Sequence, residues 1–181
     1  MSADALETFF STATQYYVAG RYAALAGLAP VVGNLLHHAV EMYLKGTLSK
    51  SKTLAELKKL GHYLPSIWTE FKAQVKDPAL DQFDGVVSAL HSFEELRYPD
   101  SLLAKGMMCT VSIKKLPPAT GGGGSGRPEP KYDLCLEEID ELMGKVFAVA
   151  SVNPKFFTGG FKKAARQYLT EENAVSGLTS A

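Results

Sequence analysis

The spacing of the apolar residues constrains this chain more than any other feature. Through the first half, they recur at steps of three and four, the spacing that lines one face of an α-helix. This pattern predicts helices over 4–26 and 30–49, a helical turn over 53–59, a third helix containing 67–75, and a fourth carrying 80–93 and stopping near Arg97. Gly27, Gly61 and the pair Asp77-Pro78 supply the breaks between them. We expect a bundle of helices.

The pattern changes near residue 109. Apolar and polar residues alternate over 109–113 and again over 132–136, which is typical of short strands, and these two could pair as a hairpin. Between them lies LPPATGGGGSGRPEP, which predicts a flexible loop over 116–131. This is no phosphate loop, because no Gly-Lys-Ser/Thr follows the glycines. A fifth helix is expected over 137–151.

The C-terminal segment FFTGGFKKAARQYL mixes aromatic and basic residues. Such a segment could lie on RNA, on a membrane surface or on its own bundle. We favour the last, an amphipathic helix that docks on the domain. One domain over 1–169 is predicted, followed by a disordered tail over 170–181.

Composition excludes several classes of protein. With 181 residues, 46% of them hydrophobic, the chain can bury one sizeable core. Nineteen basic and nineteen acidic side chains cancel, so bulk DNA binding is not expected. Cys109 and Cys135 stand alone, without the spacing of a zinc finger or a disulfide framework. An acidic N-terminus, MSADALETFF, and the lack of a long apolar run predict a cytoplasmic protein with no membrane partner.

A polar stripe follows the second predicted helix. Asn34, His38, Glu41 and Lys45 lie four, three and four positions apart, so they share one face of the helix. This face either meets solvent or lines a functional site. Glu41 and Lys45 form either a solvated pair or part of a charge-balanced pocket, and we favour the pocket. Arg97, at the inner end of the fourth helix, needs a carboxylate partner, for which the candidates are Glu41, Glu94 and Asp100.

A metal site in this stripe is not expected. His38 and Glu41 stand three residues apart on one helix, which places two possible ligands together. The sequence offers no second Glu-x-x-His element to complete the set. We therefore predict neither a metal nor a cofactor.

Three segments carry a family resemblance. They are, in order, NLLHHAVEMYLKGTL, GHYLPSIW and HSFEELRYPDS. Together they resemble the pattern of the HEPN family, and the similarity covers about residues 5–150. The resemblance implies an all-α, up-and-down bundle of four to five helices, here with a short β-hairpin insertion that bears the Gly/Pro-rich loop. It also implies a homodimer whose polar groups meet in a cleft. Relatives of this kind include RNases, toxin components, partners of nucleotidyltransferases and noncatalytic binding modules.

The chain departs from the pattern of the RNase members. There an Arg is followed, four to six positions later, by a His. Arg97 matches the Arg, but Ser101, Leu102 and Leu103 stand where the His is expected. Because a histidine accepts the 2′-OH proton far better than these residues, we expect that the chain is not an enzyme.

The leading hypothesis is a homodimeric, noncatalytic binding module for a nucleotide, an RNA end or another phosphate-bearing ligand. Its predicted binding residues are His38, Glu41, Lys45, His62, Arg97, Tyr98 and Asp100. One alternative is a metal-independent, toxin-like endoribonuclease in which Arg97 works with His62 as an unusual base. Another is a protein-interaction or antitoxin-like subunit. An apparent excess of aromatics, namely Tyr16, Tyr17, Tyr22, Phe71 and Phe83, also favours a dimer.

Overall fold

The structure, a computed structural model, describes residues 3–97, 109–115, 132–173 and 175. This part of the chain is mostly helical, with a small two-stranded sheet. The α-helices are α1 (Ala3–Leu25), α2 (Ala29–Leu48), α3 (Leu54–Lys59), α4 (Leu64–Val75), α5 (Asp84–Phe93), α7 (Leu136–Ala150), α8 (Lys155–Thr158) and α9 (Lys163–Thr170). The 3₁₀ helices are η1 (Pro78–Phe83) and η2 (Glu94–Arg97), and the strands are β1 (Cys109–Ser112) and β2 (Tyr132–Cys135).

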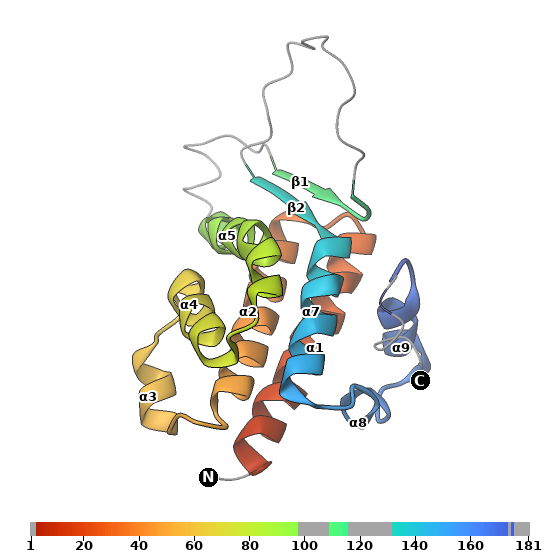
Figure 1. Ribbon diagram of the computed structural model, residues 1–181. Coiled ribbons are helices and arrows are strands. Elements are labelled where there is room, and N and C mark those ends of the chain that lie inside the picture. The colour runs from red at the N-terminus through yellow and green to blue at the C-terminus, as the bar shows by residue number, and fades with distance from the viewer. Residues whose placement is uncertain (1–2, 98–108, 116–131, 174, 176–181) are drawn as a thin grey trace.

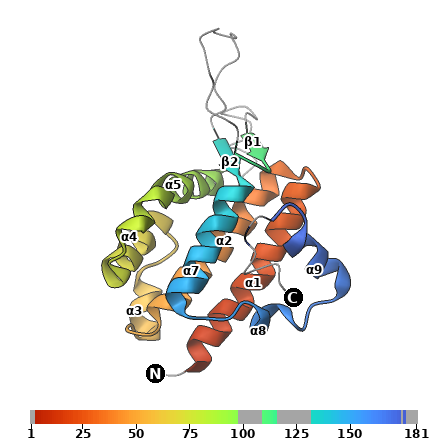
Figure 2. The ribbon, with the colours of Figure 1, turned by 45° about the vertical axis from the view of Figure 1, so that its right-hand side comes forward.

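Helix α2 is the centre of the fold. It contacts α1, α4, α5, α7, η2 and β1, and most of its residues are buried. Figures 1 and 2 show α1, α2 and α7 side by side, with α4 and α5 on one flank and α8 and α9 on the other. A polar side chain that is buried on α2 therefore needs a partner inside the protein.

The helix ends follow local chemistry, and the predicted boundaries are confirmed to within a few residues. Gly27, with a φ of 71°, ends α1, and Pro30 stands in the first turn of α2, where its missing N–H costs nothing. Thr53 and Glu56 form a reciprocal capping box at the start of α3. Only the segment after Asp77 differs, because it begins with a 3₁₀ turn before α5.

The two strands exist as predicted, but the hairpin is wrong. β1 and β2 run parallel, with Cys109 opposite Tyr132 and Ser112 opposite Cys135. A hairpin requires antiparallel strands, whereas parallel strands need a connection of roughly a dozen residues or more, which residues 113–131 provide. The cysteines lie at opposite ends of this ladder as free thiols. The flexible loop predicted over 116–131 lies outside the described residues.

The C-terminal segment docks on the domain as predicted. Helix α9 contacts α1, its Leu169 is buried, and the Tyr168 ring lies 4.8 Å from that of Tyr22. The folded part extends beyond the predicted end at 169, since Glu172 pairs with Lys114 and Asn173 donates to the Leu169 carbonyl. Residues 171–173 and 175 thus belong to the folded part, while 174 and 176–181 lie outside the described residues.

Most of the supposed excess of aromatic residues is enclosed by the single chain. Tyr17, Phe71 and Phe83 are buried in the core, so they offer nothing to a dimer surface. A stripe pattern shows which face of a helix is apolar, but it does not show how many other helices cover that face. Of the five aromatics, Tyr22 is the one classed as exposed.

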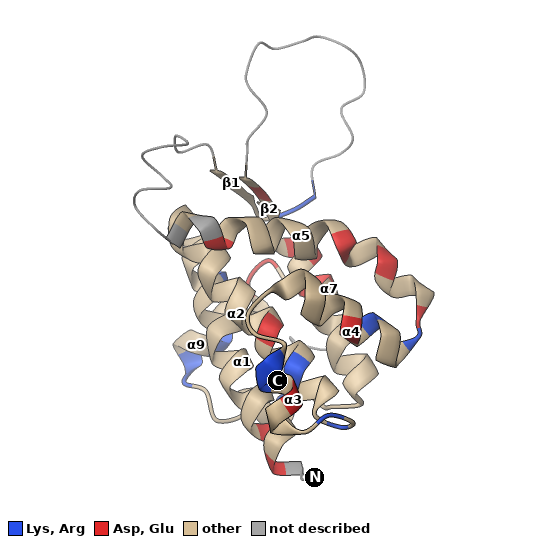
Figure 3. Ribbon diagram, turned by 90° about the vertical axis from the view of Figure 1, so that its left-hand side faces the viewer, with Lys and Arg blue, Asp and Glu red and all other residues tan. Residues whose placement is uncertain are grey.

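Charges of both signs occur along the helices of the described part. Figure 3 shows Lys and Arg interspersed with Asp and Glu over the face that it presents, as the equal totals suggest. No helix in the described part combines the length and the apolar character needed to cross a membrane.

Candidate functional site

All four histidines of the chain gather beside α2 with two glutamates. We call this group the histidine–glutamate cluster; it comprises His37, His38, Glu41, Lys45, His62, His91 and Glu94. Helix α2 supplies four of its members. The other three are His62 from the turn before α4, His91 from α5 and Glu94 from η2. Its chemistry therefore depends on how these elements pack around α2.

Glu41 is the centre of the cluster and is completely buried. Lys45 Nζ donates to its Oε1 at 2.7 Å, and His62 Nδ1 lies 2.9 and 3.1 Å from its two carboxylate oxygens. Burial acts to raise the pKa of Glu41, but the neighbouring His38, Lys45 and His62 outweigh it and hold the pKa at about 2. Glu41 is thus a buried carboxylate that stays charged.

Lys45 ties α2 to the turn that precedes α4. Its side chain is 8% exposed, and its ammonium also donates to the Gly61 carbonyl at 2.6 Å. Gly61 has a φ of 62°, a conformation that favours glycine. With two of its three donors used inside the protein, Lys45 holds this turn in place and presents little charge to solvent.

His62 is the exposed member of the cluster. Its side chain is 71% exposed, although Nδ1 is held by the buried Glu41. A carboxylate on Nδ1 fixes the tautomer and the direction of an imidazole ring, and leaves Nε2 to meet a ligand. The backbone is held as well, because His37 Nε2 lies 3.2 Å from the His62 carbonyl. His62 is therefore an oriented imidazole at the protein surface.

His37 lies at the inner side of the cluster, fully buried. Nε2 faces the His62 carbonyl, while Nδ1 lies 3.4 Å from the Leu90 carbonyl. Burial lowers the pKa of His37, and Glu94, the two carbonyls and Glu41 oppose this effect. A neutral ring has one N–H, so it can serve only one of the two carbonyls at a time.

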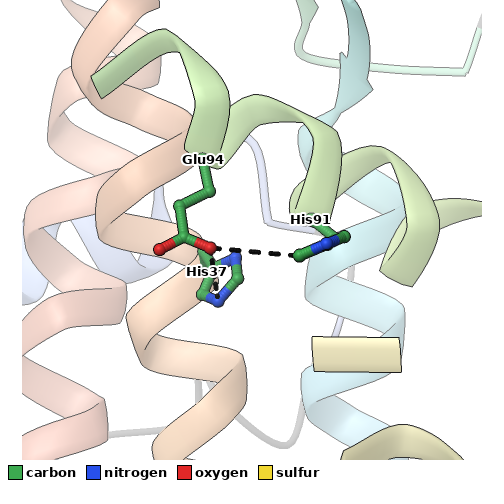
Figure 4. Close-up of side chains that lie close together, drawn as sticks. All are labelled: His37, His91 and Glu94. Atoms are coloured by element: carbon green, nitrogen blue, oxygen red, sulfur yellow. Dashed lines mark ion pairs between the residues drawn. The ribbon is translucent and has the colours of Figure 1, made fainter. Parts of the chain in front are cut away.

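His91 and Glu94 complete the cluster beside His37, as Figure 4 shows. Glu94 Oε2 lies 3.7 Å from His37 Nε2 and 3.9 Å from His91 Nδ1. The Tyr63 ring packs against the edge of His91, with the ring centroids 4.6 Å apart. His91 Nδ1 is buried, and among the described residues it has no hydrogen-bond partner.

Four of the predicted binding residues therefore meet, namely His38, Glu41, Lys45 and His62. The Glu41–Lys45 pair is buried, which rules out the solvated pair. Arg97 ends η2, but its side chain lies outside what is described, and Tyr98 and Asp100 lie outside the described residues altogether.

Sequence reasoning missed part of the cluster. His37 stands three and seven residues before Val40 and Leu44, and His91 four residues after Val87, so both fall on apolar stripes. A titratable residue on such a stripe has to be satisfied inside the protein, and this signal was available. Glu94, which the sequence offered as a candidate partner of Arg97, lies beside His37 and His91.

A second buried polar group lies between α1, α7 and α9, and sequence reasoning missed it too. Arg21 is completely buried and donates to Asp140 and to the carbonyls of Tyr168 and Glu171, while the Tyr17 hydroxyl also donates to Asp140. Burial raises the pKa of Asp140, against the pull of the Arg21 charge. Its donors are engaged within the protein, so this group fastens α9 to α1.

A groove of about 690 Å³ opens between η1, α7 and Val175. Lys115, Glu141 and Lys145 line it together with apolar residues, and it contains no member of the histidine–glutamate cluster. Its charged side chains already have partners, since Lys115 pairs with Glu141 and Lys145 with Asp77. The cluster is the stronger candidate because its groups are oriented by buried partners.

No family model, curated protein or solved structure matches this chain. The function therefore has to be inferred from the chemistry of the cluster.

Proposed function

We propose that the chain is a HEPN-like binding module that holds the phosphate of a nucleotide or RNA end with His62. The observation that carries this proposal is the exposed His62 ring with its Nδ1 fixed on the buried Glu41. A protonated imidazole held in this way offers Nε2–H to a phosphate oxygen, and bonds between charged partners are the strong ones. His38, 26% exposed and 3.8 Å from Glu41, is the neighbouring donor.

The placement of the three HEPN-like segments supports the family part of the proposal. The first supplies His38, Glu41 and Lys45 from α2, the second supplies Gly61 and His62, and the third supplies His91 and Glu94. These segments lie far apart in the sequence, yet their polar residues meet in one cluster. An up-and-down arrangement of α1, α2, α4, α5 and α7 is the bundle we propose.

Fluorescence anisotropy with a labelled single-stranded RNA tests the proposal. We expect the 5′-phosphorylated RNA to bind more tightly than the same RNA with a 5′-hydroxyl, and ATP to compete. Replacing one charge-assisted donor, as in His62→Ala, should weaken this binding about tenfold. Lys59→Ala removes an exposed charge from nearby α3 and serves as the control.

Two results would overturn the proposal. Equal weakening by both variants would mean that the RNA is held only by general electrostatic attraction. An unchanged affinity in a folded His62→Ala protein would remove His62 from the site.

A metal-independent endoribonuclease is the second candidate, because a buried carboxylate behind an exposed imidazole also suits a general base. In this role Glu41 orients His62, and His62 takes the 2′-OH proton of RNA. The test is incubation with single-stranded RNA in EDTA. Cleavage that stops when the 2′-OH is removed, and stops in His62→Ala, would replace the noncatalytic function; intact RNA would leave binding as the function.

A further inference from the structure

The inner half of the histidine–glutamate cluster has a geometry that the proposed function does not use. One possible ligand atom each from His37, His91 and Glu94 lies within 4.8 Å of the other two. They come from α2, α5 and η2, which pack together. We propose that His37, His91 and Glu94 bind a divalent first-row transition metal such as Zn²⁺.

The distances suit a metal better than they suit direct hydrogen bonds. Glu94 Oε2 lies 3.7 Å from His37 Nε2 and 3.9 Å from His91 Nδ1, too far for a hydrogen bond in either case. Zinc ligands at about 2.0 to 2.2 Å in tetrahedral geometry lie roughly 3.3 to 3.6 Å from each other. Small side-chain rotations therefore bring the three atoms onto one ion (Figure 4).

His91 supplies the second observation. Its Nδ1 is buried and without a hydrogen-bond partner among the described residues, although the ring as a whole is partly exposed. A buried polar atom without a partner is costly and needs a reason. Because Nδ1 points toward Glu94, a metal ion between them would satisfy it.

His37 has the orientation that a metal ligand needs. Its Nδ1 lies 3.4 Å from the Leu90 carbonyl, and metal-binding histidines commonly donate their other N–H to such an acceptor. This leaves the Nε2 lone pair on the side of Glu94. When the ion binds, Nε2 gives up its contact with the His62 carbonyl. That carbonyl can then accept a hydrogen bond from a metal-bound water.

The ligand types define the class of metal. Two imidazoles and one carboxylate suit Zn²⁺, Co²⁺, Ni²⁺ or Fe²⁺, whereas Mg²⁺ and Ca²⁺ prefer oxygen ligands. Three protein ligands leave at least one position for water, and Glu94 is 19% exposed.

Titration of metal-free protein with Co²⁺ and Zn²⁺ tests the proposal. We expect the visible absorption of a histidine-ligated Co²⁺ at one ion per chain, its displacement by Zn²⁺, and no response to Mg²⁺. His91→Ala should weaken Zn²⁺ binding by more than about tenfold, as losses at metal sites do. His38→Ala, which removes the neighbouring imidazole of α2 but no member of the triad, is the matched control and should bind normally.

Each other outcome counts against the site. Absence of the Co²⁺ spectrum in the wild-type protein, or unchanged affinity in His91→Ala, would overturn it. Weaker binding in His38→Ala together with normal binding in His91→Ala would move the ion to His38 and Glu41, and equal loss in both variants would mean that the three residues alone do not form the site. Circular dichroism of His91→Ala and of a second variant, His91→Gln, separates loss of the ligand from loss of the fold. No RNA is present, so the result is independent of the proposed phosphate binding.

Discussion

At the scale of single residues, Glu41 decides how the cluster is built. It is a charged group in the middle of the central helix, and its charge is compensated by Lys45 and His62. Taking two charges out of water costs about as much as their attraction returns, so such a pair adds little net stability. Removing one partner is different, because the other charge stays buried. Glu41 therefore matters because its buried neighbours need its charge, and not because the ion pair itself adds much net stability.

We predict that Glu41→Gln lowers the free energy of unfolding by about 3 to 5 kcal/mol at neutral pH, since it leaves the Lys45 ammonium buried without its carboxylate. Urea denaturation measures the loss. Glu70→Gln, which breaks the exposed pair with Lys52, is the control and should behave like wild type.

The pH dependence of that loss gives a sharper test. The folded-state pKa of Glu41, about 2, lies below its ordinary value of 4.5. The charge of Glu41 thus contributes on the order of 3 kcal/mol to the free energy of unfolding. This contribution is fully present above pH 4.5 and is lost as the pH falls from there toward 2. We expect the stability gap between wild type and Glu41→Gln to narrow over this window, measured in EDTA. A constant gap would show that the charge of Glu41 is not what stabilises the folded state.

At the scale of elements, the fold depends on how closely α2 approaches its neighbours. Gly20 of α1 faces Leu36 of α2, and a Cβ on Gly20 would lie 2.6 Å from Leu36 Cδ2. A Cβ on Gly33 of α2 would overlap the Phe93 side chain at the end of α5. Phe93 directly precedes Glu94, so this contact also positions the carboxylate of the cluster.

We predict opposite effects for two glycine substitutions. Gly33→Ala should destabilise the protein by about 1 to 3 kcal/mol, because the helices have to move apart. Gly85→Ala, where a Cβ meets nothing within 4 Å, should stabilise α5 by about 0.5 to 1 kcal/mol. Thermal unfolding compares the two. A neutral Gly33→Ala would mean that the α2–α5 contact is loose.

Elements with strong local signals could be predicted from the sequence. Gly27 with Pro30, and Thr53 with Glu56, place the helix ends by backbone chemistry that acts over a few residues. The direction of the strands could not be predicted in this way. Alternation shows which residues share a face of a strand, but it is the same for parallel and antiparallel pairing.

The candidate site was predictable only in part, for a related reason. His38, Glu41 and Lys45 share a helix face, so their spacing brings them together. That His37 meets His91, or that Arg21 meets Asp140, depends on packing between distant segments. Helical periodicity indicates that these residues point inward, but it does not identify their partners.

At the scale of the whole molecule, apolar side chains remain exposed around the connection between α1 and α2. Tyr22, Leu28 and Val31 are each close to half exposed. Exposed apolar residues that lie together mark interaction surfaces more often than scattered ones do. This region, rather than the aromatic residues of the core, is where we place the contact of the predicted homodimer.

We predict a particle of twice 19.5 kDa, about 39 kDa, by light scattering at micromolar concentration. The double variant Leu28→Lys, Val31→Lys should be a monomer with an unchanged helical spectrum, because both positions are exposed in the single chain. A wild-type particle of 19.5 kDa would refute the dimer, and a dimeric double variant would move the contact elsewhere.

The anchoring of α9 by Arg21 bears on how the protein is synthesised. Arg21 leaves the ribosome before its partners, because Asp140 follows 119 residues later and the Tyr168 carbonyl 147 residues later. Until then the guanidinium is best left in water, because burying it alone costs several kcal/mol. We therefore expect the inner face of α1 to close fully only on a chain that has reached α9, and a truncated translation product to keep this face open to proteases.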